Sequence, residues 1–292
     1  MFSIIIPAYN EEQVIVNTMQ TCQDVLQKIG NNKSEIIIID DGSNDRTNEF
    51  AHNAGCRVIV HPHNIGYGRS LKDGISAARN DTIIITDADG TYPVERIPDL
   101  LNEYKKGFNM VVGARQGKHY DESFFKKLFR IMLKWMVEFT AGRQIDDINS
   151  GFRIFSKKEV QPYFLHLCDT FSFTTSLTLA YMLTGKFVKY TPIAYHKRIG
   201  KTKVRIFRDS LRTMQYIVEA IMFYNPIKIF LIFAFMFLLL TFGAFMAGIL
   251  YSTKMLYAAG IFFLGMAVII FGFGLLSVQL RKIMQVQTEK QE

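Results

Sequence analysis

The chain has 292 residues, enough for one large domain and a smaller appendage. Hydrophobic residues make up 49% of it, including 25 phenylalanines, which is a high share for a soluble protein. The net charge of +8 could indicate nucleic-acid binding, but the basic residues gather before a long apolar segment rather than in an RNA- or DNA-binding motif. Anionic lipid or a phosphate-bearing substrate accounts for them better, so we expect no nucleic-acid partner.

The larger, N-terminal part of the chain alternates apolar runs with helical patterns. The expected strands are residues 2–6, 36–39, 58–60, 82–86 and 110–112, and the expected helices are 11–29, 45–54, 68–78 and 94–104. Such a βαβ alternation predicts an α/β domain with a doubly wound, mostly parallel sheet. In sheets of this kind, ligands bind outside the carboxyl ends of the strands.

Two long apolar runs, residues 229–253 and 255–280, contain no charged side chain. Each has about 25 residues and could cross a membrane as a helix, although a pair of buried core helices is the alternative. Residues 206–224 mix basic and apolar side chains without Pro or Gly, which predicts an amphipathic helix at the membrane interface or, alternatively, on the domain surface. Pro226 is expected to separate it from the first span.

Basic residues flank the two runs unevenly. Eight Lys and Arg residues lie between 197 and 228, and Arg281 and Lys282 follow the second run, whereas the turn between the runs carries only Lys254. The positive-inside rule then places both termini in the cytoplasm. The chain opens on a strand-like run without a recognisable signal peptide. Cys22, Cys56 and Cys168 lack metal-ligand spacing, and we expect reduced thiols.

Polar motifs follow three of the expected strands. They are Pro7-Ala8-Tyr9-Asn10-Glu11, Asp40-Asp41-Gly42-Ser43 and Asp87-Ala88-Asp89-Gly90. Clustered carboxylates repel one another unless a cation or a set of hydrogen-bond donors is nearby. The pair Asp87 and Asp89 suits a hard divalent ion, Mg²⁺ or Mn²⁺, held beside a diphosphate. Such an ion would neutralise charge on a departing diphosphate.

These motifs, in this order, resemble glycosyltransferase family 2, whose members have the GT-A fold; the resemblance covers residues 2 to about 205. It implies that Pro7, Tyr9 and Glu11, with Asp40 and its neighbour Asp41, hold the base and ribose of a nucleotide-sugar. It also implies that Asp87 and Asp89 bind the diphosphate through the metal. The segment Asn64-Ile65-Gly66-Tyr67-Gly68 matches a further family element.

Three later segments resemble the polyprenyl-phosphate branch of that family more closely. They are Gly113-Ala114-Arg115, Asp147-Ile148-Asn149-Ser150-Gly151-Phe152-Arg153 and Arg198-Ile199-Gly200-Lys201-Thr202-Lys203. The resemblance makes Arg115, Arg153, Arg198 and Lys203 candidates for phosphate contacts. It places Asp147 at the reaction centre, either orienting the acceptor or acting as a base. The residues Gly90-Thr91-Tyr92-Pro93 depart from the branch pattern, which puts sugar specificity in doubt.

The implied reaction is an inverting transfer of a sugar from a UDP- or GDP-linked donor to an undecaprenyl- or dolichyl-type phosphate. The phosphate monoester has a second pKa of about 6, so it is anionic at neutral pH and hardly needs a base. Two alternatives stay open: a glycolipid synthase acting on a lipid hydroxyl, and a non-catalytic nucleotide-binding membrane scaffold. A processive synthase would carry a Gln-x-x-Arg-Trp motif, and the single Trp135 lacks that setting.

The sequence thus predicts four parts. Residues 1–205 form a cytoplasmic GT-A domain, 206–225 an interfacial helix, 226–282 a two-helix membrane anchor and 283–292 a cytoplasmic tail. Membrane lipid is an expected partner, and a homo-oligomer is left open.

Overall fold

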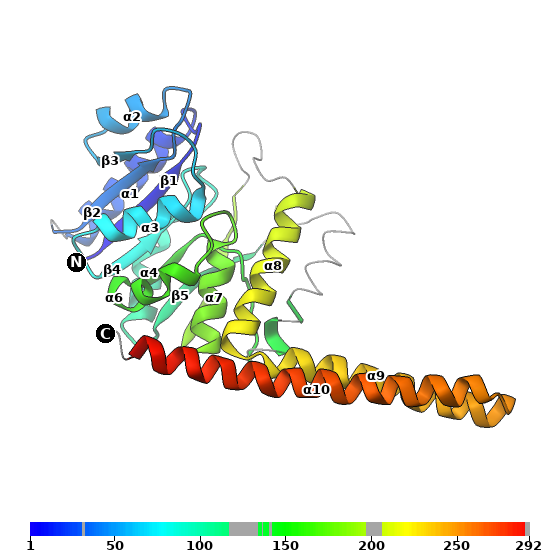
Figure 1. Cartoon of the computed structure of the whole chain (residues 1–292). Helices are drawn as coiled ribbons and strands as arrows, with labels where there is room; N and C mark the ends of the chain where they lie inside the picture. The colour runs from blue at the N-terminus through cyan, green and yellow to red at the C-terminus, as the bar shows by residue number, and fades with distance from the viewer. Residues whose placement is uncertain (31–32, 117–133, 136, 140–141, 197–205, 290–292) are drawn as a thin grey trace. The chain divides into compact units, whose positions relative to one another are not determined.

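The structure is a computed structural model that describes all residues except 31–32, 117–133, 136, 140–141, 197–205 and 290–292 (Figure 1). The chain divides into two compact units, Met1–Ile217 and Val218–Glu292. The boundary between them falls within helix α8 (Ile206–Tyr224). The interfacial position of that helix, and the four-part division around it, stay predictions.

In the described part of the first unit, one sheet of seven strands forms the centre. The strands are β1 (Ser3–Ala8), β2 (Glu35–Asp40), β3 (Arg57–Val60), β4 (Thr82–Ile85), β5 (Met110–Gln116), β6 (Arg153–Ser156) and β7 (Val188–Ala194), in the order β3-β2-β1-β4-β6-β5-β7. Only β6 runs antiparallel to its neighbours β4 and β5. The predicted doubly wound, mostly parallel sheet is therefore confirmed.

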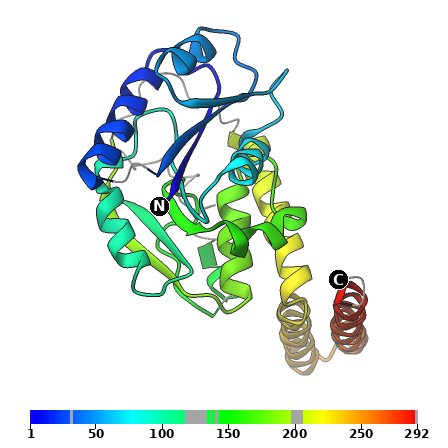
Figure 2. The same ribbon diagram turned by 90° about the vertical axis from the view of Figure 1, so that its left-hand side faces the viewer.

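Helices cover both faces of this sheet. They are α1 (Ile15–Ile29), α2 (Thr47–Asn53), α3 (Tyr67–Ala77), α4 (Ile97–Tyr104) after the 3-10 turn η1 (Val94–Arg96), α6 (Lys157–Val160), the 3-10 segment η3 (Gln161–His166) and α7 (Phe173–Leu183). Figure 2 shows α1 and α4 on one side of the sheet and α3 and α7 on the other. Alternate strand residues face the two layers: Ile4 and Ile6 join the core under α1, whereas Ile5 lies against α3 at Gly74.

The sequence did not predict β6, β7 or α7. Strand β6 is short and begins with a charged residue, Arg153. Strand β7 is an edge strand that carries Pro192, a residue that argues against a strand assignment except at a sheet edge. Helix α7 is buried on nearly every side, so it lacks the one-sided apolar stripe by which an amphipathic helix is recognised.

The start of α3 lies in close contact with the chain just before α7. A Cβ atom at Gly66, whose φ is +118°, would lie 2.5 Å from the Asp169 carbonyl oxygen, and one at Gly68 would lie 2.1 Å from the Cys168 carbonyl oxygen. Lys72 adds hydrogen bonds of 2.6 Å to the Leu167 carbonyl and to the Asp169 carboxylate. This close contact therefore requires glycine at positions 66 and 68. The contact also fixes the backbone of Tyr67, which lies between the two glycines.

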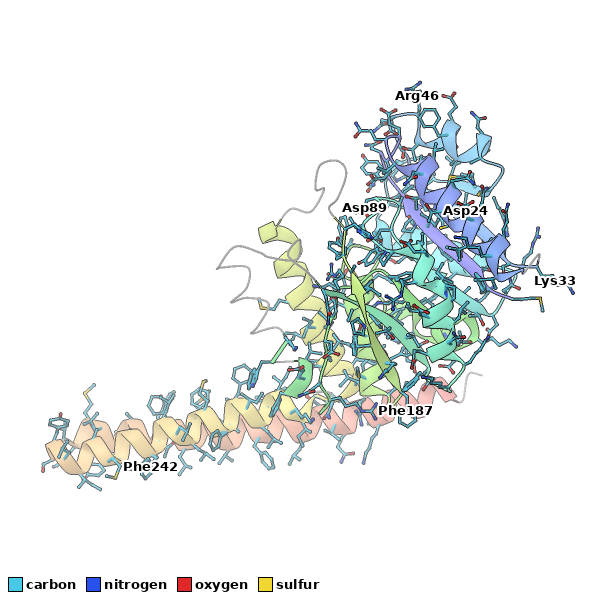
Figure 3. All side chains as sticks on the ribbon, turned by 180° about the vertical axis from the view of Figure 1, so that it is seen from behind. Asp24, Lys33, Arg46, Asp89, Phe187 and Phe242 are labelled. Carbon is cyan, nitrogen blue, oxygen red and sulfur yellow. The ribbon has the colours of Figure 1, made fainter. Side chains whose placement is uncertain are left out.

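The second unit contains α9 (Ile227–Tyr251) and α10 (Lys254–Glu289), each long and apolar enough to cross a membrane. Three glycines lie against aromatic side chains of the other helix: Gly248 against Tyr257, Gly260 against Phe245 and Gly274 against Phe230. Most remaining side chains are apolar and exposed, among them Phe242, labelled in Figure 3. An apolar surface around a helix pair is what a lipid environment requires.

We predict that Gly68→Ala destabilises the first unit. The added methyl group meets backbone atoms that cannot rotate away, and overpacking of this kind costs about 1–3 kcal/mol. Replacing glycine within a helix returns at most about 1 kcal/mol, so the net effect is a loss. Thermal unfolding of the detergent-purified chain measures it, with Ser76→Ala on the exposed side of α3 as the control. An unchanged melting temperature would contradict the close contact.

Candidate active site

The loops that follow β1 and β2 are tied to each other by side-chain hydrogen bonds. The Asn10 amide N–H donates to Ser43 Oγ (2.9 Å), and the Asn44 amide N–H donates to Asn10 Oδ1 (2.8 Å). The Glu11 amide N–H donates to Thr47 Oγ1 at the start of α2 (2.8 Å). Asn10 adopts a φ of 51°, which turns the chain sharply at the carboxyl end of β1.

Four of the predicted donor-binding residues meet at this edge of the sheet. Pro7 is buried within β1 opposite Ile39, and Tyr9 and Glu11 are half-buried just beyond it. Asp40, at the end of β2, is 1% exposed and accepts a hydrogen bond from the Ser43 amide (3.0 Å). The structure thus brings these four together, and their contact with a nucleotide stays a prediction.

Asp41, the fifth predicted donor-binding residue, is surrounded by hydrogen-bond donors from the chain before α3. Its carboxylate, 3% exposed, accepts hydrogen bonds from the amides of Ile65 (3.0 Å) and Gly66 (2.9 Å). His61 Nδ1 lies 2.9 Å from the same group. These contacts hold the turn that opens α3, and the contact of Asp41 with a nucleotide stays a prediction.

Asp87 and Asp89 lie just after β4, and each interacts with a different neighbour. The Tyr67 hydroxyl donates to Asp87 Oδ1 (2.8 Å), and burial together with the charge of Asp87 raises the pKa of Tyr67. Asp89 Oδ1 accepts from the amide (3.1 Å) and hydroxyl (2.6 Å) of Thr91. Thr18 of α1 donates to the Ala88 carbonyl between them (3.0 Å), which anchors the turn.

This pair fits a Mg²⁺ or Mn²⁺ ion that a substrate helps to coordinate. Within the described residues, no group of three or more His, Cys, Asp or Glu side chains could hold a metal ion unaided. Two carboxylates with a bound diphosphate are a common arrangement for Mg²⁺, whose remaining ligands are water. Asp87 is half-buried and Asp89 is 5% exposed, so neither side chain lies on the open surface.

Gly151 lies directly against the Asp87 carboxylate. A Cβ atom there would be 2.8 Å from Asp87 Oδ1 and 3.0 Å from the Tyr67 hydroxyl oxygen. The Gly151 amide donates to the Tyr92 hydroxyl (2.7 Å). Thr91 and Tyr92, which depart from the branch pattern, thus both form hydrogen bonds at the site. Thr91 bonds Asp89, and Tyr92 bonds Gly151 in the segment after Asp147.

Arg115 and Asp147 form a two-pronged ion pair. Arg115 Nε lies 2.7 Å from Asp147 Oδ2 and Arg115 Nη2 lies 2.8 Å from Oδ1, while the amides of Arg115 and Asn149 each donate at 3.1 Å. Burial on its own would raise the pKa of Asp147, but the hydrogen bonds and charge of Arg115 lower it below the ordinary value. Asp147 is therefore a carboxylate at every pH near neutrality. The Arg115 guanidinium also lies over the Tyr195 ring, 5.4 Å from its centroid.

Arg153 is fully buried beneath the segment that carries Asp147. Its guanidinium donates to the carbonyls of Ser150 (2.6 Å) and Ile148 (2.7 Å) and to the Thr178 hydroxyl (2.7 Å), and its exposed fraction is 0%. These hydrogen bonds fix the backbone between Ile148 and Ser150. The predicted contact of Arg153 with a phosphate stays a prediction.

Arg198 and Lys203 lie outside the described residues. The chain just before them reaches the site, because the His196 amide donates to the Thr91 carbonyl (2.9 Å). The Tyr195 ring packs edge-on against Tyr92, with ring centroids 5.4 Å apart. The predicted phosphate contacts of Arg198 and Lys203 stay predictions.

Sequence reasoning missed the aromatic residues of the site, Tyr67, Tyr92, Phe171 and Tyr195. Tyr67 and Tyr92 lie inside two segments that the sequence analysis noted, residues 64–68 and 90–93. Tyr195 follows β7 and Phe171 precedes α7, neither of which was predicted, so nothing in the sequence placed them at the site.

The sequence profile described as glycosyl transferase family 2 matches residues 3–158, just over half of the chain. A dolichyl-phosphate hexose transferase of Haloferax volcanii is 26% identical over 218 residues, covering 74% of this chain and 92% of the relative. An undecaprenyl-phosphate 4-deoxy-4-formamido-L-arabinose transferase of Proteus mirabilis is 30% identical over 165 residues, covering 53% of this chain. The chain spans 92% of the first of these relatives but only 48% of the second.

Solved structures share the fold. Glucosyl-3-phosphoglycerate synthase from Mycobacterium tuberculosis, in complex with phosphoglyceric acid, superposes with a TM-score of 0.63 at 17% identity, over 75% of this chain and 79% of that one. The same enzyme with Mn²⁺, uridine diphosphate and glucosyl-3-phosphoglycerate gives a TM-score of 0.60. These likenesses establish a GT-A-type fold for the sheet domain, as the sequence predicted. The family profile shows that the chain belongs to glycosyltransferase family 2, and the relatives named for dolichyl- and undecaprenyl-phosphate group it with the polyprenyl-phosphate branch of that family.

Proposed function

We propose that the protein transfers a sugar from a nucleotide-sugar to a polyprenyl phosphate, with inversion at the sugar, at the cytoplasmic face of a membrane. The relatives named for dolichyl- and undecaprenyl-phosphate support the acceptor class. The observation that carries the proposal is that the Asp147 carboxylate is hydrogen-bonded to Arg115 and Asn149, in the segment whose Gly151 lies against Asp87.

The donor end of the site is assigned to Asp87 and Asp89 with Mg²⁺ or Mn²⁺. Bound there, the ion would act as a Lewis acid toward the diphosphate leaving group. The solved relative crystallised with Mn²⁺ and uridine diphosphate supports both the ion and a UDP-type donor, and a GDP-linked donor stays open. Tyr9, Glu11 and Asp40, which meet at the ends of β1 and β2, are proposed to hold the nucleoside.

The acceptor end is assigned from the chemistry of Asp147. A hydroxyl acceptor needs a general base whose pKa lies near the working pH. Arg115 lowers the pKa of Asp147, which therefore makes a poor base. A phosphate monoester needs none, because it is already anionic at neutral pH. This favours a polyprenyl phosphate over a lipid hydroxyl, with Asp147 orienting Arg115. Arg198 and Lys203 are proposed, from the sequence alone, as further phosphate contacts.

Membrane attachment is assigned to α9 and α10. Charged residues flank the pair on the side of the chain termini, which supports two spans with both ends in the cytoplasm. This topology would place the catalytic unit on the side where nucleotide-sugars are made. A non-catalytic scaffold would have no need for the Asp87–Asp89 pair.

We predict that Asp89→Asn nearly abolishes transfer while leaving the fold intact. The amide oxygen can still accept the hydrogen bonds of Thr91, but the charge that would bind the metal is gone. Charge stabilisation by a metal is worth several kcal/mol, so the rate should fall more than about 100-fold. The measurement is transfer from a radiolabelled nucleotide-sugar to polyprenyl phosphate, with Asp99→Asn on the exposed side of α4 as control. Wild-type turnover of the variant in the presence of a chelator would refute the metal assignment.

We predict that Asp147→Asn lowers the rate without changing the shape of the acid side of the pH profile. If the acceptor is a phosphate, activity falls as pH drops through about 6, where the acceptor gains its second proton. Asp147 cannot cause that fall, because its lowered pKa keeps it ionised there. The kcat/KM of both proteins between pH 5 and 8 decides the point. Loss or displacement of the acid limb in the variant would instead identify Asp147 as a base.

We predict that Thr253→Cys reacts with a membrane-impermeant maleimide in intact cells, whereas a cysteine added after Glu292 does not. Thr253 lies in the turn between α9 and α10, and the topology proposed above puts that turn outside. Cys56, the half-buried native cysteine, serves as an internal control, since it should label only after permeabilisation. Labelling of the tail in intact cells would reverse the topology.

A further inference from the structure

The Tyr67 hydroxyl contacts the carboxylate that we assign to the metal. It donates to Asp87 Oδ1 at 2.8 Å. We propose that Tyr67 is a positioning residue for Asp87, holding that carboxylate in the orientation from which it binds a divalent cation. The inference rests on the proposed function, because it assumes the metal role of Asp87. None of the family motifs identified in the sequence assigns a part to this hydroxyl.

The Tyr67 ring is itself held in place. It stacks on Phe171 with ring centroids 5.8 Å apart and planes 9° from parallel. The flanking residues Gly66 and Gly68 lie against the backbone at Cys168 and Asp169, with no room for a side chain. The ring therefore cannot move away from Asp87 unless the contact between α3 and the segment before α7 opens.

A second group, Gly151, also contacts the same carboxylate. Gly151 approaches so closely that a Cβ atom would be 2.8 Å from Asp87 Oδ1 and 3.0 Å from Oδ2. The backbone of Gly151 is fixed in turn by the hydrogen bond of its amide to Tyr92. Asp87 is thus contacted both by the Tyr67 hydroxyl and by Gly151, and these contacts restrict its rotation.

The geometry of the Tyr67 hydroxyl suits this role, because it donates to one carboxylate oxygen of Asp87, at 2.8 Å. Groups that hydrogen-bond a metal ligand orient it, and removing one such group commonly weakens metal binding by about 10- to 100-fold. A single hydroxyl on an aromatic residue is therefore expected to have a measurable effect on metal affinity.

The test is Tyr67→Phe in the full-length, detergent-purified chain. This change removes the hydroxyl and keeps the ring that stacks on Phe171. Binding of Mn²⁺, followed by the electron paramagnetic resonance signal of the free ion, is measured with the metal alone and with UDP or GDP present. We expect Mn²⁺ affinity to fall about 10- to 100-fold. The metal concentration for half-maximal transfer should rise by the same factor, with the rate at saturating metal largely restored.

Two further variants serve as a negative control and as a second perturbation of Asp87. Tyr163→Phe removes a hydroxyl that bonds Thr184 rather than Asp87, and it should leave Mn²⁺ affinity unchanged. Gly151→Ala introduces a methyl group where Asp87 and Tyr67 now lie, and it should weaken Mn²⁺ binding as Tyr67→Phe does.

The outcomes separate this inference from the function on which it rests. If wild-type protein binds no Mn²⁺ with either nucleotide, the metal assignment fails and the role of Tyr67 fails with it. If wild-type protein binds Mn²⁺ and Tyr67→Phe binds it equally well, the role of Tyr67 alone is overturned. If the variant loses thermal stability and added metal does not restore its rate, Tyr67 is structural, and the inference is again overturned.

Discussion

Carboxylates that lie at one edge of a parallel sheet repel one another. The structure of this site depends on the hydrogen-bond donors that each carboxylate receives. The donors come from different loops: Ser43 for Asp40, the turn at Ile65 and Gly66 for Asp41, Tyr67 for Asp87, Thr91 for Asp89, and Arg115 with Asn149 for Asp147. Hydrogen bonds to an ionised group favour its charged form, so they offset both burial and repulsion. The same bonds tie the loops together, because most donors lie on a segment other than the acceptor's.

This arrangement gives the acidic residues different tasks. Asp41 and Asp147 are 3% and 4% exposed, and their hydrogen bonds hold the α3 turn and Arg115 respectively. Asp87, which is half-buried at the solvent edge, is oriented rather than enclosed. A sheet edge of this kind can hold several carboxylates close together, as the proposed binding of one cation and one diphosphate requires.

Much of the fold could be predicted from the sequence because the first five strands are short, strongly apolar runs that end in turn residues. The strands after residue 116 escaped prediction because they lie where the sheet changes direction, at β6, or ends, at β7. For the site, the sequence located Asp87 and Asp89 through their spacing. It could not show the hydrogen bonds of Asp41 and Arg153, because most of their partners are backbone amides and carbonyls that only the fold brings together.

The position of β7 along the chain has a consequence for how the protein is made. This strand ends at Ala194, and α9, the first helix able to span a membrane, begins at Ile227. Every strand of the described sheet is therefore synthesised before α9 and α10. Domains fold as units during synthesis, from the N-terminus onward. The last pairing, of β7 with β5, closes a long loop and is intrinsically slow. All the strands of the described sheet are thus available for pairing before α9 and α10 are made.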